Sequence, residues 1–454
     1  MQKNKIKSLF LDNWCILAVL IISLILHILA LKELGFNYSL NSDDADYIKS
    51  GIVFLQTDKI TMHDVLSAQI MPGMTFLIAI MALIFGVGSK LIISLKILWL
   101  VMGLLTIYIV YKTIKLYSNQ YIAAISCLFF LAADYIWMDN LILTETPYIL
   151  LFSLLIYHTL KLSMKANKKD FILIVIYYIL AGLLIDYLHE KKAEVSVFDD
   201  REEDKISKDI LEKLKKYNFK LLIRQCIIAG IILLLCLIPW TYRNYKIFNH
   251  FIPLTYGTGN PLLLGTYQGS GYPTDEELDY VKNVDEKMPA EMKYYLQNPN
   301  KKDYMTKYYS LEYDGLKAKY RMHEWWNKDK VSMLKSYLIY KPLQNFDNYF
   351  YWDTIMGISG NQLNVVRKVE IILFVISSIL IFINKKRIKE WLFLILTYGS
   401  QIAIYSYTFA FSRYAISMFF IRYIIIGIGI LSFCEIYKSR RGKRNESVND
   451  NSSI

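Results

Sequence analysis

Three carboxylates stand within four positions directly after the first long apolar run of the chain. The stretch 41–50, NSDDADYIKS, carries Asp43, Asp44 and Asp46, followed by Tyr47. Like charges this close favour the uptake of a proton, which suits a general base or a ligand for a cation or a cationic group. Acids beside a span also mark the extracellular edge of proteins that do no chemistry there, and composition alone leaves both interpretations open.

Two arginines could supply positive charge opposite these acids. Arg243 stands just outside a span that ends at Trp240, and Arg413 stands at the expected external start of a late helix. The planar guanidinium of Arg can bind a phosphate through two parallel hydrogen bonds. The alternative for each is ordinary, because an interfacial Arg often extends to lipid headgroups without binding a substrate.

Three more titratable residues lie at the same expected membrane edge. Asp139 and Glu145 belong to the stretch DYIWMDNLILTETP, and an acid inside hydrocarbon is costly and usually functional. The Thr-Pro that follows Glu145 could instead begin a helix, which would leave this acid in water at a helix N-terminus, where negative charge is favoured anyway. His63, in TMHDV, could touch a donor or an acceptor, although a single loop histidine is more often simply solvated.

The elements that must hold these residues are membrane-spanning helices. The chain has 454 residues, 54% of them hydrophobic, and long apolar runs recur along it. Such runs predict an all-α, polytopic helical membrane protein with about 8–10 spans. The candidate segments are 14–34, 70–87, 90–111, 121–138, 141–160, 171–188, 221–239, 367–384, 390–411 and 414–436.

The remaining composition argues against other classes of protein. All five cysteines lie in apolar runs with no CxxC pair, which indicates packing residues rather than a disulfide framework or a metal cluster. The net charge of +12 is spread as Lys and Arg beside the spans, so we expect contact with anionic lipid and no nucleic-acid partner. The Lys-, Ile-, Tyr- and Asn-rich usage suggests a low-GC bacterium, so together with the apolar runs we expect a multi-pass protein of a bacterial plasma membrane.

Basic residues orient the chain. Both ends are basic, so we expect the N- and C-termini in the cytoplasm. Treating 70–87, which opens with Pro72-Gly73, as an interfacial helix places the acidic loop 35–70 on the external face. We expect a membrane module over 1–239, with a charged cytoplasmic insert at 189–220, and a small, mostly helical external cap over 240–366, with a loop at 257–271. Membrane helices over 367–437 should follow, and then a tail over 438–454 that is first basic and then disordered.

Several stretches, taken in order, resemble the GT-C glycosyltransferases. DDADYIKSGIVFL (43–55) followed by MPGMTFL (71–77) looks like the start of the family 39 branch, which holds the protein O-mannosyltransferases and the aminoarabinose transferases. LILTETPYILLFSLL (141–155) resembles the acid-plus-helix segment of that branch, and PWTYRNYKIFNHFIPL (239–254) resembles its Pro-Trp-x-x-Arg-Asn exit from a span. SRYAISMFFI, from residue 412, is a weaker echo, and the charged region after 171–188 departs from the pattern.

The resemblance implies an integral membrane glycosyltransferase. Such enzymes transfer a sugar from a polyprenyl phosphate, on the external side and with inversion, to a hydroxyl of a glycan, lipid or protein acceptor. The family's base is the acid four residues before the tyrosine, which corresponds to Asp43, with Asp44 and Asp46 as further candidates. No cofactor is required, although the three acids could hold a divalent cation. The candidates for binding substrate or phosphate are Arg243, Glu145, Arg413, Tyr47 and His63.

Two other classes of function remain open from the sequence. A transporter or flippase for a lipid-linked glycan would pair acids and arginines in mid-membrane and carry broken spans in matching halves. A non-catalytic component of a glycan assembly would tolerate the loss of the Asp43 carboxylate. We see no matching halves, and the acids cluster at the ends of spans, so the glycosyltransferase is the main hypothesis.

Overall fold

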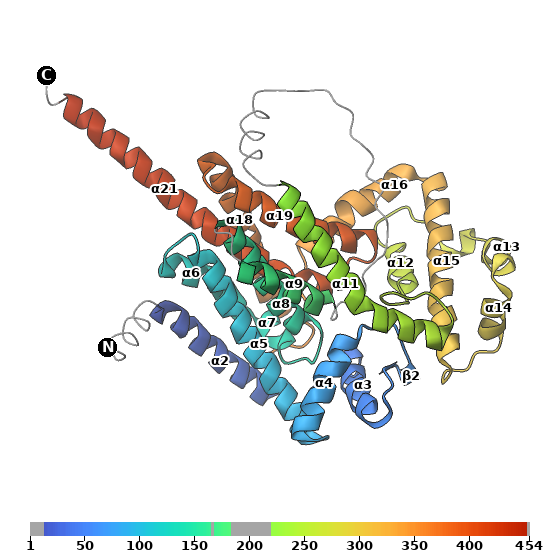
Figure 1. The fold of residues 1–454 in the computed structure, drawn as a ribbon. Coiled ribbons are helices and arrows are strands. Elements are labelled where there is room, and N and C mark those ends of the chain that lie inside the picture. The colour runs from blue at the N-terminus through green and yellow to red at the C-terminus, as the bar shows by residue number, and fades with distance from the viewer. Residues whose placement is uncertain (1–12, 165–167, 183–218, 452–454) are drawn as a thin grey trace.

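The computed structural model describes residues 13–164, 168–182 and 219–451, and these residues are almost wholly helical (Figure 1). Among them the only strands are Thr61–Met62 (β1) and Val65–Leu66 (β2), which form a short antiparallel hairpin. The predicted all-α fold class is therefore confirmed. The predicted charged insert at 189–220 lies almost entirely outside the described residues.

Four stretches of described helix are long and apolar enough to cross a bilayer, fewer than the 8–10 spans expected from hydropathy. They are α2 (Trp14–Leu34), α5 (Ser89–Lys115), α8 (Glu145–Met164) and Ser412–Arg441, which combines α20 (Ser412–Ile416) with much of α21 (Phe419–Asn451). The other helices of the N-terminal half are α3 (Asp43–Thr57), α4 (Pro72–Phe85), α6 (Gln120–Ser126), the 3₁₀ turn η1 (Cys127–Leu131), α7 (Ala133–Met138), α9 (Lys168–Gly182) and α11 (Phe219–Phe248).

Local sequence explains where several of these helices begin. Pro72 occupies the first turn of α4, where its missing N–H costs nothing and its fixed φ favours the helix. Asn119 accepts hydrogen bonds from the first backbone N–H groups of α6. Ser359 and Gln362 form a reciprocal capping box at the start of α18 (Gly360–Asn384).

The segment after α11 folds into a helical cap that lies to one side of the membrane helices (Figure 1). We call residues 257–346 the cap. Within the expected loop 257–271, the structure has the short helix α12, so that part of the prediction is wrong. The elements of the cap are α12 (Gly259–Gly265), η2 (Asp275–Glu277), α13 (Tyr280–Asn283), η3 (Asp285–Lys287), α14 (Ala290–Gln297), α15 (Tyr304–Lys328), α16 (Lys330–Lys335), the π-helical turn η4 (Ser336–Tyr340) and α17 (Lys341–Phe346).

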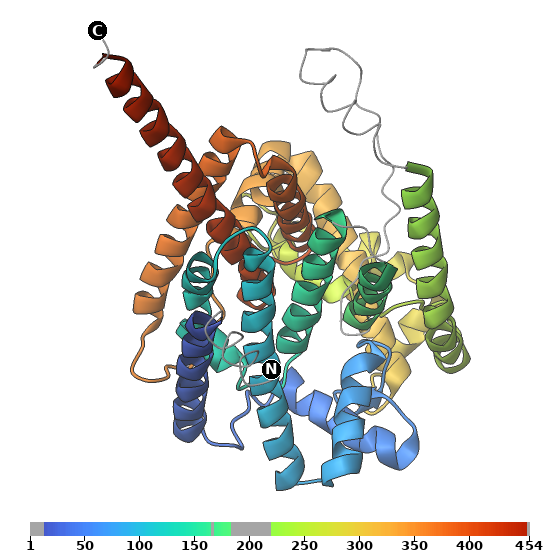
Figure 2. The same cartoon turned by 60° about the vertical axis from the view of Figure 1, so that its left-hand side comes forward.

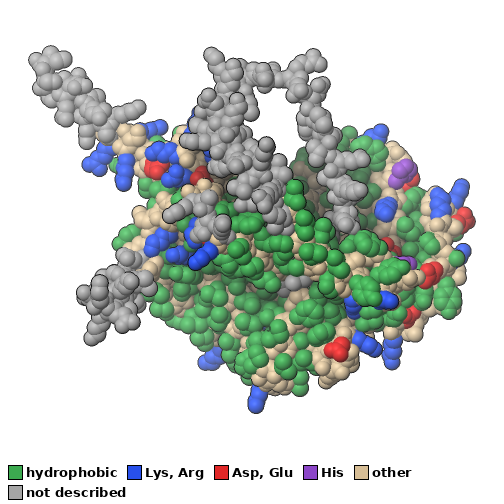
Figure 3. All heavy atoms as spheres, viewed as in Figure 1, with side chains coloured by type: hydrophobic (Ala, Val, Ile, Leu, Met, Phe, Trp, Pro, Cys, Tyr) green, Lys and Arg blue, Asp and Glu red, His purple; other side chains and the backbone are tan. Residues whose placement is uncertain are grey.

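The C-terminal helices return the chain to the middle of the membrane helices. Helix α21 begins inside the bundle, with α18 and α19 (Ile388–Tyr407) beside it, and its C-terminal part projects beyond the other helices (Figure 2). Residues 418–428 of this helix and the turn before it are almost all buried. Hydrophobic side chains cover most of the face over the membrane helices, whereas charged side chains gather on the cap and at the edges (Figure 3). The distribution is that of a polytopic membrane protein.

Candidate active site

A cavity of about 150 Å³ lies where the starts of three helices converge. Its walls come from the first turns of α3 and α8, from the loop 62–70, and from α20 with its neighbouring residues. Two acids and one arginine are set among aromatic rings. The principal lining residues are Asp43, Glu145, Arg413, Tyr47, Tyr148, Tyr405, Phe411 and Tyr414.

Arg413 joins the two acids of the cavity. Its Nη1 donates a hydrogen bond to Asp43 Oδ2 at 2.6 Å, and its Nε donates to Glu145 Oε1. The exposed side-chain fraction is 33% for Asp43, 13% for Arg413 and 7% for Glu145. Two carboxylates therefore share one guanidinium, and two of the three side chains are largely shielded from solvent. When both acids are ionised, these three residues carry a net charge of −1.

All three residues sit at the first turn of a helix. Asp43 is the first residue of α3 and Glu145 the first of α8, where the unpaired backbone N–H groups favour a negative charge. Arg413 is in the first turn of α20, where a positive charge gains nothing from the helix. The two carboxylates stabilise the positive charge of Arg413 in place of the helix. These two contacts also connect the first turns of α3, α8 and α20.

Two polar atoms in the cavity have no hydrogen-bond partner in the described part of the chain. They are Glu145 Oε2 and Gln69 Oε1, and both atoms are buried. Each is an acceptor, and a buried acceptor without a partner costs free energy until a donor reaches it. The cavity is thus suited to a ligand that presents hydroxyl or N–H groups.

The three predicted acids do not act as one group. Asp44 is only 2% exposed, and its carboxylate accepts hydrogen bonds from the backbone N–H of Leu40, at 2.9 Å, and of Ser42, at 3.2 Å. Asp46 pairs with His63 Nδ1 at 2.7 Å. Neither Asp44, Asp46 nor His63 lines the cavity. Successive residues of a helix point in different directions, which is why neighbours in the sequence are separated here.

This separation of the three acids bears on whether they could bind a divalent cation together. Asp43, Asp44 and Asp46 each face a different partner, so the trio does not converge on a single point. Within the described ranges, no three His, Cys, Asp or Glu side chains are grouped as metal ligands. The expectation that the three acids could jointly hold a cation does not fit this geometry.

Arg243 lies outside the cavity but holds one of its walls. Its guanidinium donates to the backbone oxygen of Ser67, at 2.8 Å, and to the side chain of Asn244, at 2.9 Å. It also packs over the ring of Trp240, 5.0 Å from the centroid. The loop 62–70, whose Ser67 accepts this hydrogen bond, also contains Gln69, which lines the cavity. Of the two predicted arginines, Arg413 is therefore in the site and Arg243 supports it.

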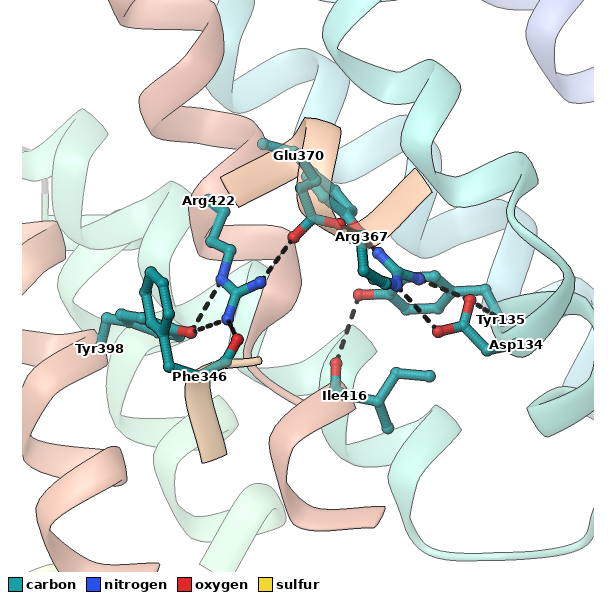
Figure 4. Close-up of polar contacts among 9 residues, drawn as sticks. Asp134, Tyr135, Phe346, Arg367, Glu370, Tyr398, Ile416 and Arg422 are labelled. Atoms are coloured by element: carbon teal, nitrogen blue, oxygen red, sulfur yellow. Dashed lines mark hydrogen bonds and ion pairs between the residues drawn. The ribbon is translucent and has the colours of Figure 1, made fainter. Parts of the chain in front are cut away.

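The sequence reasoning missed a second, fully buried group of charges (Figure 4). Arg367 on α18 donates to both carboxylate oxygens of Asp134, with Nε at 3.0 Å from Oδ2, and also to Glu370. Arg422 on α21 donates to the other oxygen of Glu370 at 3.0 Å and to the hydroxyl of Tyr398 at 2.8 Å. Each of these acids and arginines is at most 1% exposed. Charged residues inside apolar runs were the signal that could have found them.

This buried charge cluster, Asp134–Arg367–Glu370–Arg422, has two arginines and two acids, so its charges balance. It joins α7, α18 and α21 in the interior. Beside it, Tyr135 donates from its hydroxyl to the backbone oxygen of Ile416, at 3.3 Å, at the end of the short helix that carries Arg413 (Figure 4). A residue next to the cluster therefore contacts the helix that carries Arg413.

A second hollow, of about 200 Å³, is almost wholly apolar and shares helix α8 with the cavity. Pro147, Leu150 and Leu151 of α8 form one wall, and α4, α5 and α9 form the others. Pro147 is one residue from Tyr148, which lines the charged cavity. The charged cavity and the apolar hollow thus adjoin the same first turns of α8.

One family model matches part of the chain. Residues 70–187, about a quarter of the chain, match the family model described as dolichyl-phosphate-mannose-protein mannosyltransferase. The match confirms, over these residues, the resemblance to GT-C glycosyltransferases inferred from the sequence. Comparison with curated protein sequences gives no significant match.

Two solved structures are similar to this chain at low sequence identity. One is ArnT from Cupriavidus metallidurans bound to undecaprenyl phosphate, with 11% identity, a TM-score of 0.36, and coverage of 92% of this chain and 77% of that chain. The other is the archaeal oligosaccharyltransferase AglB from Archaeoglobus fulgidus in complex with an inhibitory peptide and a dolichol-phosphate, with 11% identity and a TM-score of 0.41. The alignment with AglB covers 96% of this chain and 52% of that chain.

Proposed function

We propose that this protein is an integral membrane glycosyltransferase. It moves a sugar from a polyprenyl-phosphate donor to an acceptor hydroxyl on the external face of the membrane, with inversion at the anomeric carbon. The observation that carries the proposal is the cavity in which Arg413 bridges Asp43 and Glu145. The family-model match to residues 70–187, which include Glu145, supports it independently.

Asp43 is the proposed general base. It is the most exposed of the three charged residues of the cavity, so an acceptor hydroxyl can approach it. In the reaction the acceptor O–H bond breaks and its proton passes to the Asp43 carboxylate. The acceptor oxygen forms a bond to the anomeric carbon as the bond from that carbon to the phosphate oxygen breaks. Displacement from the opposite side inverts the configuration, and the lipid phosphate leaves with the electron pair.

Arg413 is the proposed ligand of the donor phosphate. Its guanidinium is planar, always charged, and able to bind phosphate oxygens in pairs. In the absence of donor it is already held by two carboxylates, so a phosphate must compete with them. We infer that donor binding draws Nη1 away from Asp43, which frees that carboxylate to take the acceptor proton. The base would then be available chiefly when the donor is in place.

The apolar hollow supports a lipid-linked donor. It is lined by Gly73, Leu77, Met102, Leu180 and the apolar residues of α8, and it adjoins the charged cavity through α8. A prenyl chain in this hollow would exchange contacts with lipid tails for packing contacts with apolar side chains. Its phosphate would then reach the side of the cavity where Glu145 and Arg413 meet.

A transporter or flippase is the second candidate, and one observation favours it. The buried charge cluster pairs acids and arginines between helices, as such proteins often do. However, its four side chains are fully paired and line neither the charged cavity nor the apolar hollow. A cluster of this kind is sufficiently explained by its role in joining α7, α18 and α21.

The proposal is tested by a transfer assay with the purified protein in nanodiscs. A panel of labelled polyprenyl-phosphate sugars would be offered with hydroxyl acceptors, and turnover would be compared for the wild type, Asp43→Asn and Asp46→Asn. We expect Asp43→Asn to lose about 10²–10⁴-fold, the usual contribution of a general base. Asp46→Asn, on the same helix but outside the cavity, serves as the control and should keep its activity. Equal turnover in all three proteins would remove the base, and lipid movement across the bilayer without transfer would favour the transporter.

A further inference from the structure

One face of helix α5 makes hydrogen bonds to the turn between α7 and α8, residues 139–144. Lys96 donates from Nζ to the backbone oxygen of Asn140, and Trp99 donates from Nε1 to the backbone oxygen of Leu143 at 3.0 Å. Lys96 and Trp99 are three residues apart, and Gly103 lies four residues further on, so the three share one helix face. A Cβ at Gly103 would overlap the carboxylate of Asp139. Glycine at this position thus leaves room for the Asp139 carboxylate against α5.

A histidine from another span holds the same turn. His27, on α2, is 2% exposed, and its Nδ1 lies 2.7 Å from the backbone oxygen of Ser23. Since a carbonyl only accepts, Nδ1 must carry a proton. The other ring nitrogen, Nε2, lies 3.1 Å from Asp139 Oδ2, and Asp139 is 6% exposed. Each residue thus gives the other a polar partner in an apolar interior, where either residue alone would be costly.

The pair is connected to the candidate active site through one hydroxyl. Thr146 donates from Oγ1 to Asp139 Oδ1 at 2.7 Å. Thr146 follows Glu145 directly in the first turn of α8, and it is 2% exposed. A chain of contacts thus runs from His27 through Asp139 and Thr146 to the backbone beside Glu145. From there the Glu145 carboxylate reaches Arg413, and Arg413 reaches Asp43.

We propose that His27 and Asp139 are positioning residues for the candidate active site. Acting through Thr146, they set where α8 begins, and so they fix the Glu145 carboxylate against Arg413. This inference rests on the proposed function only for its effect on turnover. The geometric claim, that the pair sets the first turn of α8, stands apart from the reaction and can be tested separately.

The geometric test measures the reactivity of a cysteine placed beside Glu145. Thr144 lines the cavity and is 8% exposed, so Thr144→Cys in a cysteine-free background reports the position of this turn. The rate of modification by a small maleimide would be measured with and without Thr146→Val. We expect Thr146→Val to change the rate at least about threefold, because a buried acceptor on Asp139 loses its donor. Thr146→Ser, which keeps the hydroxyl, should restore the original rate.

A matched control is available in the same region. Thr106 lies on α5, is 3% exposed and borders a small cavity with His27 and Asp139, but its hydroxyl donates only to its own helix, at Met102 O. Thr106→Val should leave the cysteine rate and the turnover unchanged. His27→Gln provides a second variant of the pair, checked for folding by its thermal unfolding midpoint. An unchanged cysteine rate in folded Thr146→Val and His27→Gln would overturn the proposal.

The catalytic test asks whether Thr146 acts through Glu145. In the transfer assay, Thr146→Val should lower kcat/KM about tenfold, since small displacements of positioning groups have large effects on rate. In a Glu145→Gln background the same change should have much less effect, because residues acting as a unit are not additive. Fully additive losses would contradict the proposal. If the wild type transfers no sugar at all, the proposed function fails, while the cysteine rates still decide the positioning role.

Discussion

Arg413 Nη1 lies 2.6 Å from Asp43 Oδ2, although 370 residues separate the two in the sequence. This ion pair joins the first turn of α3 to the first turn of α20. Both residues line the cavity, and Arg413 also donates to Glu145, which lines it as well. The first prediction follows from this geometry.

Replacing Arg413 should lower the rate of transfer, strongly with alanine and less with lysine. Arg413→Ala leaves both carboxylates without their cation and removes the proposed phosphate ligand, so we expect a loss of about 10²-fold or more in kcat/KM. Arg413→Lys keeps the charge but cannot donate to Asp43 and Glu145 from separate nitrogens in a planar fork, so it should recover only part of the activity. Kinetics with varied donor would measure both. Arg387→Ala, outside the cavity, is the control, and a loss equal to that of Arg413→Ala would contradict the prediction.

Asp44→Asn should reduce stability rather than chemistry. The Asp44 carboxylate accepts hydrogen bonds from the backbone N–H groups of Leu40 and Ser42, and an amide can satisfy only one of them well. We expect a loss of about 1–3 kcal/mol in the free energy of unfolding. Turnover per folded molecule should remain near that of the wild type. Thermal unfolding and the transfer assay, run on the same sample, test this, and a stable but inactive Asp44→Asn protein would refute it.

Breaking the buried charge cluster should be strongly destabilising. Asp134→Asn leaves Arg367 without a carboxylate that accepts two of its hydrogen bonds, in a place with almost no water. Removing one partner of a buried pair typically costs about 3–5 kcal/mol. Glu435→Gln is the control, because its ion-pair partner Lys386, at 3.4 Å, is 60% exposed, and a Gln oxygen can still accept from Asn384, so the change should cost less than about 1 kcal/mol. Similar unfolding midpoints for the two variants would speak against a structural role for the cluster.

Lys341 should make the stability of the fold depend on pH. It is fully buried, its Nζ lies 3.2 Å from Thr408 O, and burial lowers its pKa to about 7. In the unfolded chain a lysine titrates near pH 10.4, so between about pH 7 and 10.4 the unfolded state binds a proton that the folded state does not. Stability should therefore rise with pH across this window, by at most about 1.4 kcal/mol per unit, and be independent of this group below it.

Substitution isolates the contribution of Lys341. Lys341→Met should remove this part of the slope, whereas Lys335→Met, on the exposed surface of α16, should preserve it. Thermal unfolding midpoints at pH 6.5, 8 and 9.5 would be compared for the three proteins. An unchanged slope in Lys341→Met would show that other groups cause the pH dependence.

Two helical glycines should respond in opposite directions to alanine. At Gly429 of α21, an added Cβ would lie 2.6 Å from the backbone Cα of Ser377 on α18, so the two helices would have to separate. Overpacking of this kind costs about 1–3 kcal/mol. At Gly399 of α19 nothing lies within 4 Å, so alanine should be neutral or stabilising by up to about 1 kcal/mol. Unfolding midpoints of both variants test the close packing of α18 and α21.

Much of the fold was predictable from the sequence because membrane helices are specified locally. In a bilayer every backbone hydrogen bond must be made within the segment, so a long apolar run already implies a helix. Pro72 and the Thr146-Pro147 pair are local signals for helix starts, although α8 begins at Glu145 itself, and Glu145 is buried rather than in water. The sequence also identified Asp43, Glu145 and Arg413 as candidates, since charges at the ends of apolar runs stand out.

Only the tertiary structure decided which candidates share a site. It brought together Asp43 and Arg413, and it separated Asp43 from Asp44 and Asp46, because one helical turn sends neighbouring side chains to different partners. It also paired His27 with Asp139, which no spacing along the chain could indicate. The sequence determined which segments are helices and where their charges lie. The packing of those helices, which depends on contacts between residues far apart in the chain, determined which charges meet.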